Sequence, residues 1–349
     1  MRYERACHER LIGVLTVNVR AARYLGCMSM MSVEHVRLAA QRLRGVVRHT
    51  PLLESAELSS KSGLIIRMKM ESMQHTGSFK FRGASNALAL LEKSAGLRGV
   101  ATHSSGNHAL ALATAARARG FACTVIMPND APRSKRAAVT DAGAKIIMCE
   151  PTMHSREATL AEVVARSGAV VIPPFDHVDV ICGQGTIGLE IVDEWPAVDV
   201  IVAPIGGGGM IGGIALAAKC CKPSIVVIAA EPAVADDAAR SKCTGMRQPA
   251  TNAPTLADGL RAGIGELTLP LLQKFVNDVV TVSEHDIAHW MQFAFEQMKL
   301  VIEPSAAVGV AALCSPTFQS MAKKSGWKNV ALVICGGNVD LDRLPWLTR

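Results

Sequence analysis

The sequence predicts an α/β protein built on parallel sheets, and two observations support this prediction. Short apolar strands alternate with helices along most of the chain, which is the pattern of βαβ units. The composition agrees, because 49% of the 349 residues are hydrophobic while only 4% are aromatic. Such a mixture suits thin helices packed tightly on parallel strands. The length is sufficient for one large domain or two ordinary ones.

The alternation of strands and helices is clearest between residues 99 and 172. There we expect strands at 99–105, 123–127, 145–149 and 169–172, separated by helices at 107–119, 135–141 and 156–166. Elsewhere we expect helices at 33–43, 79–93, after Gly185, at 286–300 and from Ser305, and strands at 64–70, 200–205, 225–231 and 330–334.

Charge and cysteine content exclude several classes of function. The net charge of +7 is spread along the chain without a basic block, so we expect no nucleic-acid partner. The ten cysteines are scattered and resemble free thiols of a reducing compartment rather than a disulfide or zinc framework. Residues 200–218 lack charge, but Pro204 and a run of glycines favour a strand, a loop and a buried helix over a membrane span.

Residues 1–31 form an N-terminal extension with five arginines and two glutamates. A mitochondrial presequence would have this basic character. The alternative is a disordered extension or an upstream in-frame start, since methionines follow at Met28, Met30 and Met31. We favour the second interpretation and expect a cytoplasmic location.

Three segments at loop-to-helix junctions carry chemistry. In 78–84 (SFKFRGA), Lys80 stands between two phenylalanines, and a lysine that forms an imine must be rigidly held and partly desolvated. Segment 102–108 (THSSGNH) offers free backbone amides to a carboxylate, although a simple helix cap is the alternative. The glycines 206–209 follow a buried strand and suit a phosphate better than a plain flexible loop.

Two further segments are weaker signals. Glu231 and Asp237, with a carbonyl between them, suit a hard divalent cation, but acidic residues there more often cap a helix. Cys335 follows the buried strand 330–334, so it is expected at the carboxyl edge of a sheet, where sites of α/β proteins collect. A buried structural thiol is the usual role of such a cysteine.

Together, and in this order, the five segments resemble the fold-type II (tryptophan synthase β-like) pyridoxal-phosphate enzymes. The nearest branch is that of the serine racemases and serine/threonine dehydratases, and the resemblance covers residues 33–341. It implies two parallel-sheet α/β domains with pyridoxal 5′-phosphate in the cleft between them. The large domain would comprise 32–98 and 176–349, and the small mobile domain 99–175.

The resemblance assigns a role to each matching position. Lys80 matches the Schiff-base lysine that also acts as a base, and Ser105 matches the acid/base on the opposite face, where plain dehydratases carry alanine. Asn107 matches the ligand of the cofactor's 3′-oxygen, and Cys335 the residue that faces its pyridine nitrogen. The remaining matches are the phosphate cup (Gly206, Gly207, Gly208, Gly209 and Met210), the substrate contacts (Ser104, Ser105, Asn107, His108 and Arg156) and a Mg²⁺ or Ca²⁺ site (Glu231, the carbonyl of Ala235, and Asp237).

The implied function is a serine racemase that also eliminates water from serine or threonine, and it implies a homodimer. A threonine/serine ammonia-lyase, or a relative that acts on hydroxyaspartate or aspartate, is the alternative, and Phe175 resembles the dehydratases. A non-catalytic protein that keeps the fold is disfavoured by the intact Lys80. Three ATP-contact positions of animal serine racemases are replaced by His75, Leu110 and Ala142, whereas Thr76, Lys299 and Asn338 are kept, so strong ATP activation is not expected.

Overall fold

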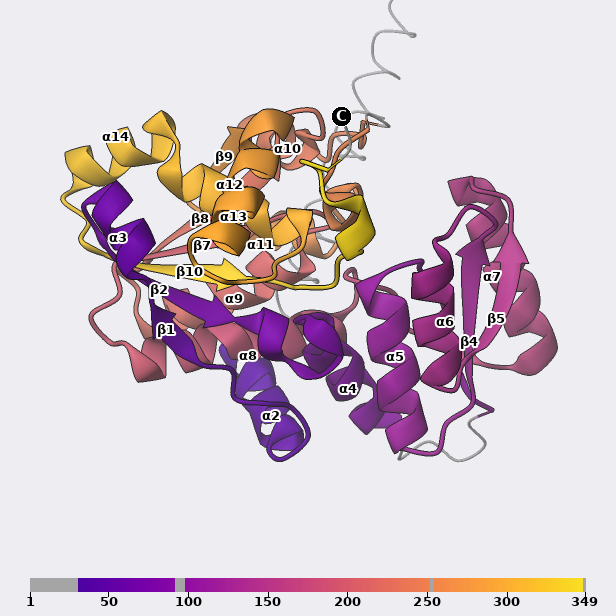
Figure 1. The fold of residues 1–349 in the computed structure, drawn as a ribbon. Coiled ribbons are helices and arrows are strands. Elements are labelled where there is room, and N and C mark those ends of the chain that lie inside the picture. Colours follow the sequence, from indigo (N-terminus) through magenta and orange to yellow (C-terminus); the bar gives the residue numbers. More distant parts are fainter. Residues whose placement is uncertain (1–30, 92–97, 252–253, 348–349) are drawn as a thin grey trace, which may run out of the picture.

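The chain folds into two lobes, each with its own β-sheet, in a computed structural model that describes residues 31–91, 98–251 and 254–347 (Figure 1). The predicted α/β fold with parallel sheets is confirmed. Apart from Met31, the predicted N-terminal extension lies outside the described residues.

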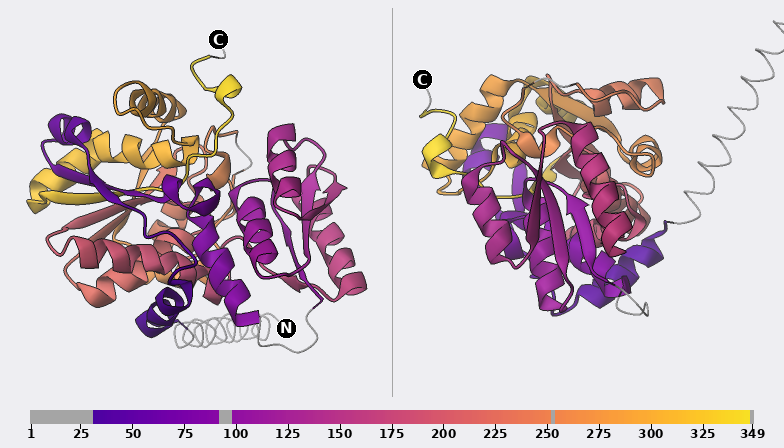
Figure 2. Two further views of the ribbon diagram at one scale, coloured as in Figure 1. Left: turned by 60° about the horizontal axis from the view of Figure 1, so that its bottom comes forward. Right: turned by 90° about the vertical axis from the view of Figure 1, so that its right-hand side faces the viewer.

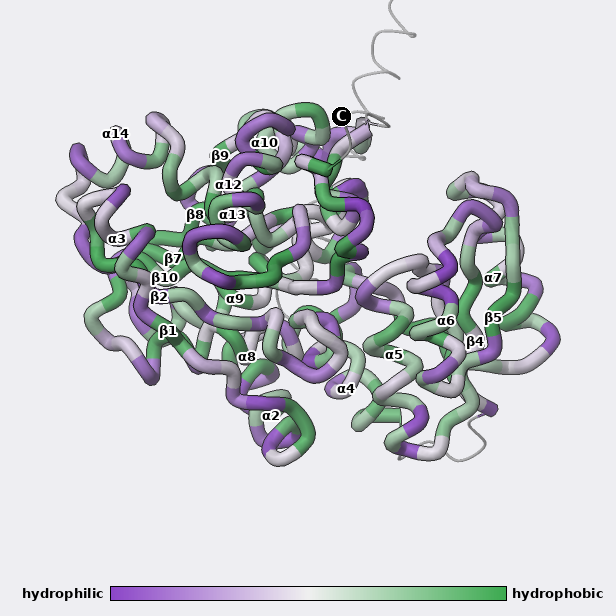
Figure 3. Tube along the Cα trace, viewed as in Figure 1, coloured by the Kyte–Doolittle hydropathy of each residue, from purple (hydrophilic) through white to green (hydrophobic). Residues whose placement is uncertain are grey.

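The large lobe contains a six-stranded sheet in the order β1-β2-β10-β7-β8-β9. Its strands are β1 (Leu52–Glu54), β2 (Ile65–Met70), β7 (Val200–Pro204), β8 (Val226–Pro232), β9 (Asp278–Val282) and β10 (Asn329–Ile334). All neighbours are parallel except β1, which pairs antiparallel with β2 at the edge. The central strands β7, β8 and β10 are mostly apolar, as expected for strands whose two faces are covered by helices (Figure 3).

Two groups of helices cover this sheet (Figures 1 and 2). On one face, α8 (Val178–Glu194) packs on α9 (Gly209–Cys221), with α2 (Val33–Leu43) against α8 and α11 (Thr268–Phe275) against α9. On the other, α13 (Pro304–Cys314) contacts β7, β8 and β10 and supports α12 (Glu284–Glu296), α14 (Pro316–Ser325) and α3 (Ala56–Ser62). Helix α10 (Asp237–Thr244) packs on β9.

The small lobe contains a four-stranded parallel sheet in the order β5-β4-β3-β6. Its strands are β3 (Val100–His103), β4 (Cys123–Pro128), β5 (Lys145–Cys149) and β6 (Val170–Val171), and its helices are α5 (Asn107–Ala118), α6 (Arg133–Asp141) and α7 (Met153–Ser167). Helix α4 (Lys80–Leu91) contacts both α8 and α5, and therefore lies between the lobes. All four strands fall inside the predicted small domain, whose boundaries and mobility stay predictions.

Most predicted elements form within a few residues of their expected bounds, but α8 begins at Val178 instead of after Gly185. The sequence pattern places the start of this helix after Gly185, whereas both Gly183 and Gly185 lie inside it. A Cβ at Gly183 would lie 2.7 Å from the Cα of Gly83, and one at Gly185 would lie 2.9 Å from the carbonyl oxygen of Gly213. These glycines therefore let α8 approach α4 and α9, so tertiary packing overrides their low helix propensity.

Residues 200–218 form β7, a glycine loop and the start of α9, as expected. In the described part of the chain, no helix is long and apolar enough to cross a bilayer.

We predict that Gly183→Ala destabilises the protein by about 3 kcal/mol, because its methyl group would meet backbone atoms of α4 that cannot move independently. Denaturant unfolding measures the loss. Gly63→Ala is the control: Gly63 has φ 69° and open space around it, so its strain alone should cost about 1 kcal/mol. Equal losses in the two variants would contradict the close α4–α8 contact.

Candidate active site

Lys80 is the first residue of α4, and backbone contacts fix its approach. The amide of Phe79 donates to the carbonyl of Cys335 at 3.0 Å, and Ser78 pairs with Gly336 in an isolated antiparallel bridge. The Nζ of Lys80 donates to the carbonyl oxygen of Pro174 at 2.8 Å. Lys80 thus lies where α4, the end of β10 and the segment before α8 meet.

Burial sets the protonation behaviour of Lys80. Desolvation lowers the pKa of its amine to about 8, and the nearby Cys335 and Glu303 oppose this shift. At pH 7 about a tenth of the amine is then neutral, and a neutral amine is the form that attacks a carbonyl. Lys80 is therefore chemically suited to the imine-forming role that the sequence predicts.

The glycine loop 206–209 joins β7 to α9 and leaves the start of that helix uncapped by any side chain. Gly208 adopts φ 86°, in the left-handed region that favours glycine. A Cβ at Gly206 would lie 2.9 Å from the Cα of Leu260, so a side chain there would clash with backbone. The loop is a backbone cup at a helix N-terminus, which is the donor set that binds a phosphate.

Two neighbours brace this cup. The hydroxyl of Thr268 donates to the carbonyl of Gly207 at 2.7 Å. A Cβ at Gly207 would lie 2.4 Å from the ring of Phe175, which therefore covers the loop. Since Phe175 follows Pro174, one short segment contacts both the cup and Lys80. The apolar side chain of Met210 is buried in the core, so its backbone amide is the group that can donate a hydrogen bond to a phosphate.

The predicted substrate loop precedes α5, whose N-cap residue Gly106 provides no side-chain cap. Ser104 and Ser105 are half-exposed on this loop, and the hydroxyl of Ser104 accepts from the amide of Gly106 at 3.4 Å. An uncapped helix N-terminus attracts a carboxylate through its free amides and dipole. The loop therefore suits the carboxylate of an amino acid.

His108 lies behind the loop instead of on its exposed side. It is buried, and its Nε2 is 2.9 Å from the carbonyl oxygen of Ile172, so Nε2 carries the proton and Nδ1 is left without a partner among the described residues. Burial, followed by the nearby Lys80 charge, lowers the pKa of His108 to about 3. The imidazole is therefore neutral at physiological pH, and its contact with a substrate stays a prediction.

Glu303 connects the predicted site residues of the two lobes. The side-chain nitrogen Nδ2 of Asn107 donates to both carboxylate oxygens of Glu303, at 3.0 and 2.8 Å. The Sγ of Cys335 lies 3.9 Å from Oε1 of Glu303. Asn338 in turn donates to the side-chain oxygen of Asn107 at 2.9 Å. Burial raises the pKa of Glu303 to about 7. In the sequence, Glu303 begins the segment 303–306 (EPSA), which fits a segment of the enzyme family that the chain resembles, but its partners Asn107 and Cys335 are far away along the chain.

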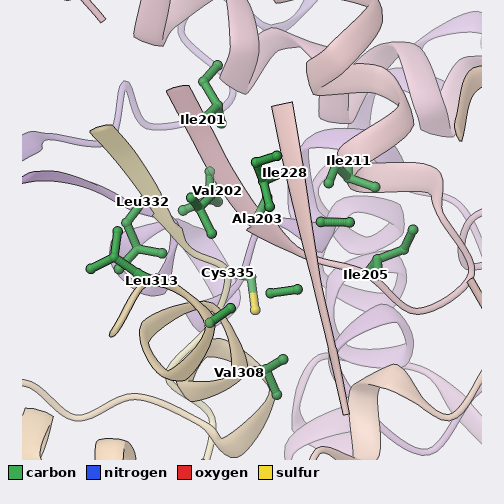
Figure 4. Close-up of a cluster of buried hydrophobic side chains, with 14 of the residues drawn as sticks. Ile201, Val202, Ala203, Ile205, Ile211, Ile228, Val308, Leu313, Leu332 and Cys335 are labelled. Atoms are coloured by element: carbon green, nitrogen blue, oxygen red, sulfur yellow. The ribbon is translucent and has the colours of Figure 1, made fainter. Parts of the chain in front are cut away.

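Cys335 is buried among apolar side chains of the large core, in the same cluster as Val308 and Ala203 (Figure 4). Burial, with a further contribution from Glu303, raises the pKa of its thiol well above the ordinary value. Cys335 is therefore a neutral thiol at physiological pH.

Arg156 lies near the start of α7, where its Nε is buried and has no partner in the described part of the chain. Its charge contributes to a lowered pKa of His103, for which burial is the main cause.

Glu231 and Asp237 lie together at the end of β8 and the start of α10. The Glu231 oxygens accept from the amides of Ala238 and Ala239, each at 2.9 Å, and Asp237 accepts from the amide of Ile264 at 3.0 Å. Burial, with mutual repulsion as a smaller cause, raises the pKa of Glu231 to about 8, and burial also raises that of Asp237. Two buried carboxylates held by backbone amides suit a divalent cation.

Two of the three residues that match ATP contacts of the related animal enzymes have unusual backbones. Among the described residues, Thr76 (φ 63°) and Lys299 (φ 57°) are the non-glycine residues with positive φ. The third position, Asn338, donates to the carbonyl of Thr76 at 2.7 Å. Thr76 and Asn338 thereby join the Asn107–Glu303 network, and sequence alone does not reveal this connection.

These residues fit pyridoxal phosphate. The glycine cup and uncapped α9 offer donors for a phosphate, Lys80 offers an amine of low pKa, and Cys335 offers a neutral group. The buried hydroxyls of Ser78 and Thr76, close to Lys80 in the chain, have no hydrogen-bond partner among the residues that the structure describes. They leave donors free for a bound molecule.

We predict that Mg²⁺ stabilises the protein more strongly as the pH rises from about 4.5 to about 8. In this window the metal-free folded protein holds a proton on Glu231 that the unfolded chain has released, so metal-free stability falls as the pH rises. A cation binds the ionised form and offsets that loss. Thermal unfolding with and without Mg²⁺ across this range is the measurement.

Glu231→Gln should flatten both the pH trend and the response to Mg²⁺. Asp236→Asn is the comparison, because Asp236 pairs with Arg240 at 2.8 Å and is only a minor cause of the raised pKa values of Glu231 and Asp237, so the response to Mg²⁺ should be largely kept. A Glu231→Gln protein that keeps the wild-type response to Mg²⁺ would rule out this cation site.

Comparison with known proteins agrees with the geometry. The profile of the family "Pyridoxal-phosphate dependent enzyme" matches residues 43–336. A serine racemase from Arabidopsis thaliana is 45% identical over 311 residues, which are 88% of this chain and 93% of that protein.

Solved structures give the same picture. The maize serine racemase superposes with a TM-score of 0.87 at 40% identity, covering 89% of this chain and 94% of that one. A pyridoxal 5′-phosphate-dependent aspartate racemase gives 0.85 at 36% identity (90% and 98% covered). The T.th. threonine deaminase gives 0.82 at 34% identity (90% and 100% covered).

Proposed function

Because the chain belongs to the family of pyridoxal-phosphate-dependent enzymes, in the branch of serine racemases and serine/threonine dehydratases, we propose that it interconverts L- and D-serine. Elimination of water from serine or threonine is the proposed side reaction, and serine then yields pyruvate and ammonia. The observation that carries the proposal is the Lys80 amine, with a pKa of about 8, whose charge acts on His108 behind the loop that presents Ser105 at an open helix N-terminus.

The residues that would hold the cofactor come from three segments. Lys80 would anchor it covalently, the amides of residues 206–210 would bind its phosphate, and Cys335 would face its ring nitrogen. When bound, pyridoxal phosphate supplies an electron-accepting ring that stabilises negative charge at the α-carbon of an amino acid. Since Cys335 stays neutral, it would not force a proton onto the ring nitrogen.

The chain's own groups move the protons. The substrate carboxylate docks on the loop Ser104–Asn107 at the start of α5, and Arg156 adds positive charge nearby. Buried His108 holds this loop in place through Ile172. Lys80, as a neutral amine, removes the α-proton from one side, and the Ser105 hydroxyl returns a proton from the other side. Two proton-exchanging groups permit racemisation, whereas one suffices for elimination.

Two alternatives use the same site. A threonine or serine ammonia-lyase needs only Lys80, and Phe175 over the glycine loop together with the threonine deaminase likeness favours it. An enzyme that acts on aspartate or hydroxyaspartate is supported by the likeness to an aspartate racemase. Product analysis with each amino acid distinguishes these alternatives.

We further propose that Glu231, the carbonyl of Ala235, and Asp237 bind Mg²⁺ or Ca²⁺. We also propose that the chain is a cytoplasmic homodimer. ATP is proposed to activate it weakly or not at all. The dimer is proposed from the family resemblance, and light scattering during gel filtration tests it. The ATP proposal follows from the replaced contacts at His75, Leu110 and Ala142.

We predict that Ser105→Ala loses D-serine production by about 100-fold or more and keeps pyruvate production from L-serine. The reason is that elimination uses Lys80 alone, whereas racemisation also requires the proton from Ser105. Purified enzyme with L-serine and Mg²⁺, followed by chiral chromatography for D-serine and by a pyruvate assay, measures both reactions.

Ser104→Ala is the matched control, because it removes a neighbouring hydroxyl of the same loop and should affect both reactions alike. Wild-type enzyme that makes only pyruvate or 2-oxobutanoate would show a dehydratase, and a Ser105→Ala enzyme that still makes D-serine would remove Ser105 from the mechanism.

A further inference from the structure

Two residues after Lys80, the fully buried Arg82 is held by two carboxylates. Its Nε and Nη2 donate to Glu71 at 2.8 Å each, and its Nη1 and Nη2 donate to Glu190 at 2.5 and 2.8 Å. Nη1 also donates to the hydroxyl of Thr186 at 3.1 Å. The guanidinium thus makes paired contacts in two directions, to the segment before α4 and to α8.

A second buried cation extends this cluster. The Nζ of Lys69, at the end of β2, lies 2.8 Å from Glu190 and 2.9 Å from Glu194, and it donates to the carbonyl of Thr50 at 2.6 Å. The hydroxyl of Thr50 donates to Glu71 at 2.5 Å. One network of charges therefore joins β2, the 3₁₀ turn Glu71–Met73, α4 and α8.

Stability is a poor explanation for such a cluster. Replacing buried ion pairs by apolar side chains of similar volume is often neutral or stabilising. What Arg82 adds is a planar fork of donors with fixed directions, which an apolar side chain or a lysine lacks. Burial lowers the pKa of Arg82, but Glu71 and Glu190 outweigh this effect and raise it overall, so its charge is constant.

The cluster lies on the side of α4 away from the Lys80 amine. Two residues along a helix correspond to about 200° of rotation and about 3 Å of rise, so Lys80 and Arg82 project in nearly opposite directions. Next to them, the amide of Gly83 donates to the side-chain oxygen of Gln184 on α8 at 3.1 Å. Helix α8 begins at Val178, four residues after Pro174, whose carbonyl accepts from Lys80.

We propose that Arg82 is the positioning residue of this active site: its paired contacts with Glu71 and Glu190 fix the rotation and height of the first turn of α4, and so aim the Lys80 amine. The part of this inference that concerns cofactor and reaction rests on the proposed function. The fixing of α4 does not, because it concerns contacts within the chain alone.

The test is Arg82→Lys, which keeps the charge but loses the fork. In the cofactor-free protein, hydrogen exchange of the amides in 80–86 should accelerate by about tenfold or more, because the first turn of α4 is released. The rate at which added pyridoxal phosphate develops its lysine-bound visible band should fall about tenfold. In the loaded enzyme, kcat should fall 10–100-fold, roughly, with KM within about threefold.

Leu58→Ala is the control for stability alone. Leu58 is buried on α3, which packs on β2 and α13. At a temperature well below unfolding, this variant should keep wild-type exchange at 80–86, wild-type cofactor capture and wild-type kcat, even with a similar drop in Tm. Thr186→Ala removes one contact of Arg82 and keeps every charge. It should change amide exchange, cofactor capture and kcat in the same directions as Arg82→Lys, by about two- to fivefold. This variant replaces Arg82→Lys if the latter does not fold.

The measurements separate the two proposals. Wild-type exchange at 80–86 and wild-type cofactor capture in both Arg82→Lys and Thr186→Ala would overturn the positioning role. Equal changes of exchange at 80–86 and of cofactor capture in Leu58→Ala would overturn the positioning role as well. If the wild-type enzyme makes no D-serine while exchange and capture change as expected, the proposed reaction fails and the role of Arg82 stands.

Discussion

The desolvation of the Lys80 amine is the constraint on which the rest of this structure depends. An amine is useful to a carbonyl cofactor only if part of it is neutral at working pH, and burial lowers its pKa to about 8 for that purpose. The Lys80 amine is desolvated in a place that contacts both lobes. That place is the start of α4, between the large sheet and the small one, with the carbonyl of Pro174 as the hydrogen-bond acceptor.

Around Lys80, backbone groups shape the site more than side chains do. Glycines at 206–209 form the cup, and Gly83 and Gly183 let α4 and α8 touch. The uncapped starts of α5 and α9 leave amides that, in the proposed function, would bind the carboxylate of a substrate and a phosphate. Side chains then add what backbone cannot: a neutral thiol at Cys335, a hydroxyl at Ser105 and the buried acid Glu303 that links the lobes.

Local pattern was enough to predict the parallel strands, the helix at 33–43 and the junction that carries Lys80, since apolar runs and turn residues act over short distances. It could not predict that α8 continues through Gly183 and Gly185, because their role depends on contacts with α4 and α9. Nor could it show that Glu303 receives Asn107, or that Arg82 joins Glu71 to Glu190. Those partners are set by the fold, whereas the roles of Ser105, Asn107 and the cation ligands came from family resemblance and stay proposals.

The most direct test of this view is the pKa of the Lys80 amine itself. In cofactor-free protein, the rate at which an acylating reagent modifies Lys80 can be followed against pH by peptide mass spectrometry, with the exposed Lys323 of α14 as an internal standard. A midpoint near 8 for Lys80 is the expected result. A midpoint near 10.5, the ordinary value of a lysine, would show that the amine is not desolvated and would contradict the active site described here.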